Sequence, residues 1–125
     1  MSLYSATFYT SDLDYLFSEK GYIEGMLKVE SALAEAQAIH GVIPDSAYHR
    51  IKEVCDRVDH IDIEKMKHGI ASGGNAVIPL VKQISAYLNS IDPPAAQYVH
   101  LGATSQDIVD TATILLIKDY INITL

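Results

Sequence analysis

The stretch MLKVESALAEAQ, residues 26–37, lies within the longest helical pattern of this 125-residue chain. The pattern spans residues 20–40, and its apolar side chains recur at the three- and four-residue spacing of one helix face. Ser18 and the acidic residue after it supply a start signal, while Gly41 supplies the left-handed residue that commonly follows a helix. The sequence therefore predicts one long helix here.

Ionisable side chains outside the main motif have ordinary structural interpretations. The glutamates of the long helix have polar spacing and are expected mostly on a solvent-exposed face; they are Glu19, Glu24, Glu30 and Glu35. Four histidines are expected at the surface or at helix ends; they are His40, His49, His60 and His68. None of the four falls in a metal-ligand motif, and Cys55 is the single cysteine of the chain, so we expect no metal site and no disulfide.

Helical signals also dominate the rest of the chain. Start signals and apolar spacing predict further helices over about 11–17, 45–58, 63–68, 78–91 and 108–125. The last segment is rich in β-branched residues, which favour strands, but its length and its lack of turn residues favour a helix. Gly69 and residues 73–75 indicate a flexible loop, and Asp-Pro-Pro at residues 92–94 indicates a hinge or linker.

These elements predict an all-α fold in two parts. Residues 1–103 are expected to form an N-terminal helical domain, and residues 104–125 the start of a bundle helix. The final pattern stops at Leu125 without a cap, which indicates the front part of a longer protein. Such a chain is expected to expose apolar surface along residues 108–125 and to self-associate.

The composition argues against several functional classes. Apolar residues make up 49% of the chain and charged residues 20%, as in soluble globular proteins. A net charge of −7 without a Lys/Arg cluster argues against nucleic-acid binding. No apolar run is long enough to span a membrane, and the first residues lack the regions of a signal peptide. We therefore expect a cytoplasmic protein without a membrane partner.

The run VHLGATSQD, residues 99–107, carries the densest set of chemical groups in the chain. Its polar side chains are those of His100, Thr104, Ser105, Gln106 and Asp107. Hydroxyls and N–H groups at a helix start can hold an anion such as a carboxylate. A second interpretation is a helix cap formed by Thr104 or Ser105, with Asp107 complementing the helix dipole. The cap leaves His100, one hydroxyl and Gln106 without an explanation.

A second loop, Gly-Gly-Asn at residues 73–75, also has two interpretations. It is compatible with simple turn chemistry. Alternatively, its glycines let the backbone approach a ligand, with Asn75 as a neutral hydrogen-bonding group. A nucleotide-binding loop is excluded, because the chain has neither of the glycine-rich phosphate motifs.

Four segments together resemble the fumarase/aspartase superfamily. Residues 16–18 with 26–37 resemble its first long helix, residues 41–44 (GVIP) its usual end, and residues 99–112 the first of three signature regions. The ordered set covers nearly the whole chain and is far more specific than any one segment. The resemblance implies the N-terminal helical domain of that all-α fold and the start of its central helical bundle.

Two branches of the superfamily compete. Adenylosuccinate lyases carry a His-Asp pair where this chain has Asn75 and Ala76. The string GNAVIPLVK, residues 74–82, is instead similar to the bacterial 3-carboxy-cis,cis-muconate cycloisomerase family, as is GATSQD at residues 102–107. Leu101 departs from that family, which usually has Trp there.

The resemblance to the cycloisomerase family implies a cofactor-free reaction, in which an internal carboxylate adds across a double bond to form 4-carboxymuconolactone in aromatic catabolism. The substrate is a small anionic polycarboxylate, and Thr104 and Ser105 match positions that hold its carboxylate. His100, Gln106 and Asp107 would line or shape the site, and Asn75 would replace the lyase histidine. Family members are homotetramers whose sites combine residues from three subunits.

The same resemblance implies that this chain holds no catalytic residue. The family carries its base on a Gly-Ser-Ser loop followed by a Met-Pro-x-Lys element, and a further histidine on the second signature region; neither occurs here. We therefore expect the 125 residues alone to be inactive. The alternatives are an adenylosuccinate lyase or related dicarboxylate lyase, and a non-catalytic helical interaction module.

Overall fold

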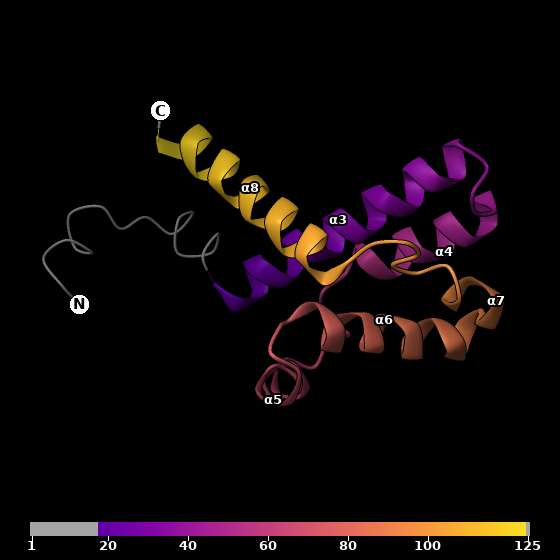
Figure 1. The fold of residues 1–125 in the computed structure, drawn as a ribbon, viewed down its shortest axis with the longest axis horizontal. Helices are drawn as coiled ribbons and strands as arrows, with labels where there is room; N and C mark the ends of the chain where they lie inside the picture. Colours follow the sequence, from indigo (N-terminus) through magenta and orange to yellow (C-terminus); the bar gives the residue numbers. More distant parts are fainter. Residues whose placement is uncertain (1–17, 125) are drawn as a thin grey trace, which may run out of the picture.

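The structure, a computed structural model, describes residues 18–124 and is all-α over that range, as the sequence predicts (Figure 1). The short helix expected over residues 11–17 lies outside the described residues. Figure 1 shows α3 and α4 side by side, α8 crossing α3, and α6 on the other side of the loop that leads into α8. The helices are α3 (Glu19–Ile39), α4 (Asp45–Cys55), α5 (Ile63–Gly73), α6 (Val77–Ile91), α7 (Pro93–Ala96) and α8 (Ser105–Thr124).

Helix α3 begins and ends where its sequence signals predict. The hydroxyl of Ser18 accepts a hydrogen bond of 3.0 Å from the backbone N–H of Gly21, which satisfies one of the free donors of the first turn. At the other end, Gly41 has a φ of 72°, a conformation that glycine adopts without a steric cost. Pro44 then precedes the first residue of α4.

The core is formed where α3, α4, α6 and α8 meet. Its largest fully buried side chains come from all four helices: Met26, Leu27, Ile51, Val54, Val77, Leu80, Ile84, Leu88 and Ile108. The apolar stripe predicted for α6 is confirmed, since Leu80, Ile84 and Leu88 have no exposed surface. These side chains bring the start of α8 against α3 and α6, which positions the loop before it.

Helix α5 is longer than predicted, and the prediction of a loop at Gly69 is wrong. Gly69 lies within α5, and a Cβ atom there would come within 2.9 Å of the Cγ of Pro79 in α6. Glycine is therefore required by a close approach between helices rather than by a turn. The loop begins only at Gly74, whose φ of 83° ends the helix. Helix α4 is shorter than predicted and ends at Cys55.

Substituting the two glycines inside helices by alanine is expected to have opposite effects. Gly69→Ala should lower the free energy of unfolding by about 1 to 2 kcal/mol, because its Cβ collides with Pro79. Gly25→Ala should raise it by about 0.5 to 1 kcal/mol, because its Cβ meets Ala112 at an ordinary 3.8 Å and alanine favours helices. Urea unfolding followed by circular dichroism measures both, and equal effects would contradict the close approach.

The Asp-Pro-Pro segment ends α6, as predicted, but it is not a free hinge or linker. Pro93 and Pro94 occupy the first positions of α7, where the missing N–H of proline costs no hydrogen bond. Helix α7 contacts both α4 and α6, and the guanidinium of Arg50 donates a hydrogen bond of 3.3 Å to the carboxylate of Asp92. The segment therefore contacts α4 both before the bend, through Asp92, and after it, through α7.

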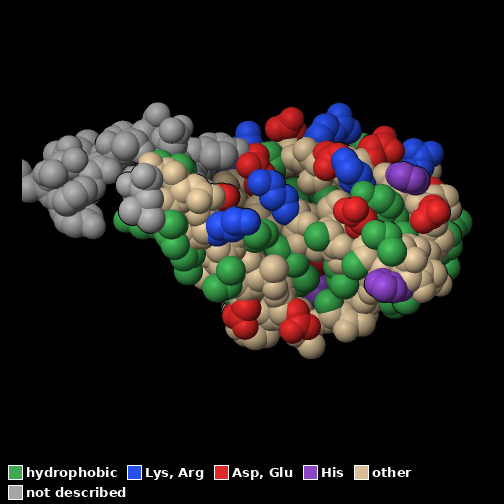
Figure 2. Space-filling view, turned by 90° about the horizontal axis from the view of Figure 1, so that it is seen from above, with side chains coloured by type: hydrophobic (Ala, Val, Ile, Leu, Met, Phe, Trp, Pro, Cys, Tyr) green, Lys and Arg blue, Asp and Glu red, His purple; other side chains and the backbone are tan. Residues whose placement is uncertain are grey.

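Apolar side chains of α8 are buried near its start and are mostly exposed from Ile114 onward, where Leu115 and Leu116 are half-buried. Ile108 and Ala112 lie in the core, whereas Ile114 is 62% exposed. Further exposed apolar side chains follow at Ile117, Tyr120, Ile121 and Ile123. The sequence predicts this exposure of the last helix. Figure 2 shows one face of the molecule, on which hydrophobic side chains reach the surface between acidic and basic ones. No helix among the described residues is long and apolar enough to cross a membrane.

Candidate functional site

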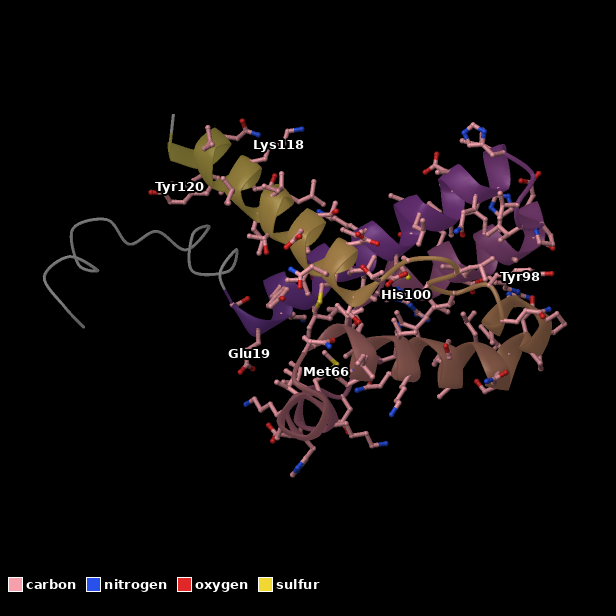
Figure 3. The ribbon with its side chains drawn as sticks, viewed as in Figure 1. Glu19, Met66, Tyr98, His100, Lys118 and Tyr120 are labelled. Carbon is pink, nitrogen blue, oxygen red and sulfur yellow. The ribbon has the colours of Figure 1, made fainter. Side chains whose placement is uncertain are left out.

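The loop between α7 and α8 contains the main candidate residues and turns sharply. His100 has a φ of 59°, which is uncommon for a residue with a side chain, and Gly102 has a φ of 75°. The N–H of Ala103 donates to the carbonyl of His100 at 3.3 Å, which closes the turn between them. Figure 3 shows His100 in the middle of the molecule, where this loop passes between α3 and α6.

His100 is fixed by a buried partner on α3. Its Nδ1 lies 2.6 Å from Oε1 of Glu30, and the two side chains are 18% and 1% exposed, respectively. Burial raises the pKa of Glu30, while the charge and the hydrogen bond of His100 act in the opposite direction. The expectation that Glu30 lies on a solvent-exposed face is therefore wrong. It occupies the apolar stripe of α3, between Met26 and Ala34, and pairs with a residue 70 positions away.

A second side chain of α3 holds the same loop. The side-chain amide of Gln37 donates a hydrogen bond of 2.7 Å to the backbone carbonyl of Leu101. Gln37 lies two helical turns after Glu30, so both side chains point from one face of α3. The loop is thus fixed at two consecutive residues, His100 and Leu101. Sequence reasoning missed both contacts, although the position of Glu30 within an apolar stripe was a usable signal.

Thr104 and Asp107 form a reciprocal cap at the start of α8. The N–H of Asp107 donates to Oγ1 of Thr104 at 3.2 Å, and the N–H of Thr104 donates to the carboxylate of Asp107 at 3.0 Å. The hydrogen bond from the Thr104 backbone lowers the pKa of Asp107, and the Thr104 side chain and the charge of His100 add to this effect. The cap interpretation of these two residues is confirmed, and their contact with a ligand stays a prediction.

Removing either half of this cap is expected to destabilise the protein modestly. Thr104→Ala should lower the free energy of unfolding by about 1 kcal/mol, Asp107→Ala should lower it as well, and the double variant should lose less than the sum, because both changes remove one motif. Thr111→Ala is a matched control, since Thr111 is exposed on the same helix. Urea unfolding at pH 7 measures the effects, and strict additivity would contradict a reciprocal cap.

Ser105 and Gln106 occupy the first turn of α8. The amide of Gln106 donates a hydrogen bond of 2.7 Å to the carboxylate of Asp110, so this side chain lies along the helix surface. Ser105 is half-buried, and its hydroxyl makes no hydrogen bond to another of the residues 18–124. Hydroxyls keep a proton to donate even when they accept a hydrogen bond, as Thr104 does. The Ser105 hydroxyl at this helix start can therefore donate to an anion, and the Thr104 hydroxyl can do so in place of its contact with the Asp107 carboxylate.

Asn75 caps the start of α6. Its side-chain oxygen accepts hydrogen bonds from the N–H groups of Val77 at 3.0 Å and of Ile78 at 3.1 Å. Helices α6 and α8 contact each other, and Figure 1 shows that their first turns are the neighbouring parts. The structure therefore brings two capped helix starts, one after Asn75 and one after Thr104, to the same region. The turn interpretation of Asn75 is confirmed, and a ligand role for it is untested.

Two other features of the described chain lie apart from these residues. A groove of about 550 Å³ lies between α3 and α8, lined by residues such as Gly25, Lys28, Leu116 and Lys118, and it includes none of the predicted site residues. Within residues 18–124, no group of three or more His, Cys, Asp or Glu side chains is arranged to hold a metal ion. The candidate chemistry is thus that of hydrogen-bond donors and one buried acid–imidazole pair.

Comparisons with known proteins agree with this arrangement. The 3-carboxy-cis,cis-muconate cycloisomerase of Acinetobacter baylyi is 44% identical over 118 residues, which are 94% of this chain and 26% of that protein. A crystal structure of the 3-carboxy-cis,cis-muconate lactonizing enzyme from Pseudomonas putida matches with a TM-score of 0.91 and 38% identity, over 98% of this chain and 28% of that one. The adenylosuccinate lyase of Methanocaldococcus jannaschii is more distant, with 36% identity over 91% of this chain and 24% of its own.

The chain therefore spans about a quarter of the length of the relatives it matches. A family model described as lyase matches residues 7–125, nearly the whole sequence. The resemblance to the fumarase/aspartase superfamily is confirmed by these matches, and the chain belongs to this lyase family.

Proposed function

We propose that the chain is the N-terminal part of a 3-carboxy-cis,cis-muconate cycloisomerase, an intramolecular lyase that forms 4-carboxymuconolactone. The observation that carries this proposal is the 44% identity to a cycloisomerase over 94% of the chain, against 36% to an adenylosuccinate lyase. Asn75 supports the same choice, because it stands where adenylosuccinate lyases carry a histidine. The substrate is a small polycarboxylate, and the reaction uses no cofactor.

The start of α8 is the proposed carboxylate receptor. Ser105 and Thr104 donate their hydroxyl protons, and the N–H groups of Ser105 and Gln106 have no partner within the helix because of their position in its first turn. His100 adds a ring N–H, and Asp107 holds the turn through its bonds to Thr104. Preorganised donors of this kind stabilise the anion that develops next to a carboxylate during addition or elimination.

The proposed enzyme is a cytoplasmic homotetramer in which several subunits complete each site. This chain supplies groups that bind the substrate, including Asn75 at the start of α6, while the base that moves the proton comes from sequence outside it. The exposed apolar side chains of α8 from Ile114 onward, Ile117 among them, are the surface through which the bundle is expected to continue.

A chimera tests the proposal. The aligned part of the Acinetobacter baylyi cycloisomerase is replaced by residues of this chain, and turnover of 3-carboxy-cis,cis-muconate and of adenylosuccinate is measured. We expect turnover of the first compound and none of the second. Ser105→Ala in the chimera should lower kcat/KM about 100-fold, as the loss of one preorganised donor does. Thr111→Ala on the exposed face of α8 is the matched control and should leave kcat/KM unchanged.

Two outcomes would contradict the proposal. Turnover of adenylosuccinate, with none of carboxymuconate, would favour the adenylosuccinate lyase alternative. A folded chimera that turns over neither compound would favour a helical interaction module without catalysis.

The 125-residue chain alone is expected to be inactive, because its sequence has neither the Gly-Ser-Ser loop that carries the base of the family nor the histidine of the second signature region. Purified chain is mixed with 3-carboxy-cis,cis-muconate, and loss of the conjugated double bonds is followed by absorbance. The intact chimera serves as the positive control at equal concentration. Turnover by the chain alone would show that it carries its own base.

A further inference from the structure

The acid–imidazole pair between α3 and the signature loop combines deep burial, a short contact and an uncommon backbone conformation. Glu30 is 1% exposed on its side chain, and its Oε1 lies 2.6 Å from Nδ1 of His100. The loop adopts a φ of 59° at His100 while placing the ring against Glu30. A role in core packing alone does not explain an acid at position 30, because an apolar residue of the same size packs there at a lower desolvation cost.

The number of protons on this pair decides what the other ring nitrogen can do. If the pair carries no net charge, either as neutral acid with neutral imidazole or as carboxylate with imidazolium, Nε2 of His100 bears a proton in both forms. If the pair carries one negative charge, the single imidazole proton sits on Nδ1 and donates to Glu30, so Nε2 is an acceptor. Nε2 of His100 is therefore a hydrogen-bond donor when the Glu30–His100 pair is neutral, and a hydrogen-bond acceptor when the pair is anionic.

The surroundings favour the neutral pair. Oε2 of Glu30 is buried and has no hydrogen-bond partner among the described residues, so a full negative charge there would be poorly compensated. Among residues 18–124, the titratable groups of other helices that interact with the pair are Cys55 and Asp107, and neither carries a positive charge. Burial raises the pKa of the Cys55 thiol of α4 to about 12, which keeps it neutral. Asp107 of α8 is anionic and interacts with His100.

We infer that Glu30 is a positioning residue of the substrate site: it fixes the ring of His100 through Nδ1, and while the pair carries no net charge Nε2 bears a proton, so that the ring donates a hydrogen bond to a carboxylate of the substrate. The ligand in this inference rests on the proposed function, whereas the position of the proton does not. Histidine is thereby given a single hydrogen-bonding role over a range of pH, which an unpaired imidazole at the surface does not have.

The proton on Nε2 is tested directly by nitrogen NMR. The chain is labelled with 15N-histidine, the His100 signals are assigned by their loss in His100→Asn, and the two ring nitrogens are followed from pH 6 to pH 8. We expect Nε2 to have the chemical shift of a protonated nitrogen at pH 7. A bare Nε2 with a proton on Nδ1 would overturn the inference, whatever the chimera does in the assay.

The consequence for binding is tested with Glu30→Met in the active chimera. Methionine has a similar volume and packs in the core, but it neither holds Nδ1 nor attracts its proton. We expect KM for 3-carboxy-cis,cis-muconate at pH 7 to rise about 10-fold, with a smaller change in kcat, because a ring that is no longer fixed binds the ground state less well.

The pH profile separates this role from a structural one. In the unmodified chimera kcat/KM should fall at alkaline pH, when the pair loses its proton and Nε2 becomes an acceptor. In Glu30→Met that fall should be weaker, because no carboxylate draws the remaining proton to Nδ1. Gln37→Met is the matched control: it removes the other contact of α3 with the loop, 2.7 Å from the Leu101 carbonyl, and should keep the alkaline fall. Equal profiles for all three proteins would overturn the inference.

Discussion

Replacing His100 with alanine is expected to lower the free energy of unfolding by about 3 kcal/mol at pH 8, but by only about 1 kcal/mol at pH 4. The physical reason is Glu30, which stays buried after its partner is removed. At pH 8 the variant must either bury an unpaired carboxylate or hold a proton that the unfolded chain has released. At pH 4 the carboxyl group is largely protonated in both states, so only the lost contacts remain.

The sign of the pH dependence follows from the direction of the pKa shift. Burial raises the pKa of Glu30 above its ordinary value of 4.5, so the folded chain binds this proton more tightly than the unfolded chain does. The stability that this proton contributes is fully present below the unfolded pKa and is lost as the pH rises through the folded pKa. Removing His100 takes away both influences that lower the pKa of Glu30, so the window of loss extends to higher pH.

Urea unfolding at pH 4, 6 and 8 measures this effect in the wild-type chain, in His100→Ala and in the double variant with Glu30→Met. The double variant shares the lost ring and the strained backbone of the single variant, but it lacks the buried acid. Its loss of stability relative to wild type should therefore change less with pH than that of His100→Ala. If the loss of stability of His100→Ala is equal at all three pH values, burial of the unpaired Glu30 carboxyl group does not destabilise the folded chain.

Local signals in the sequence predicted the helices because local interactions fix their ends. Ser18 caps α3 through a residue three positions away, and Gly41 follows α3 with a left-handed φ. Each of these rules involves neighbours within a few residues. The β-branched α8 was also predicted correctly, since its length outweighed its strand propensity.

The features that the sequence did not predict depend on contacts between distant residues. Gly69 looks like a turn glycine, and only the approach of Pro79 from another helix explains why it lies within α5. Glu30 looks like one of several surface glutamates, and its partner is 70 residues away. Its place in line with Ile23, Met26 and Ala34 was the available signal, because an acid within an apolar stripe must find a buried partner.

The sequence predicted which residues make up the candidate site, but not the hydrogen bonds that connect them. The sequence identified the residues of the loop and of the α8 start, from His100 to Asp107. It left open whether Thr104 and Asp107 cap the helix or face a ligand, and the structure shows that they cap each other. The place of Glu30 in the apolar stripe indicated a buried partner, but it did not identify His100 as that partner or Gln37 as a second contact with the loop, because such contacts depend on how α3 crosses the loop.

Truncating Ile84 in α6 to alanine is expected to lower the free energy of unfolding by about 3 kcal/mol. Its side chain has no exposed surface and lies where α6 meets the rest of the core, between Leu80 and Leu88 on the same stripe. The loss combines the apolar surface returned to water with the cavity left behind, because helices held by several neighbours close in only partly. Urea unfolding at pH 7 measures it.

Ile78→Ala is the matched control for this prediction, because it makes the same chemical change on the same helix at a residue that is 42% exposed. Both variants alter helix propensity equally, so any difference between them reports burial. We expect the control to lose about 0.5 kcal/mol, since much of its side chain is already in water. Equal losses would mean that α6 is not held by its buried stripe in solution. A larger loss for Ile84 would mean that α6 is held against the core by this stripe, and with it Asn75 at the helix start.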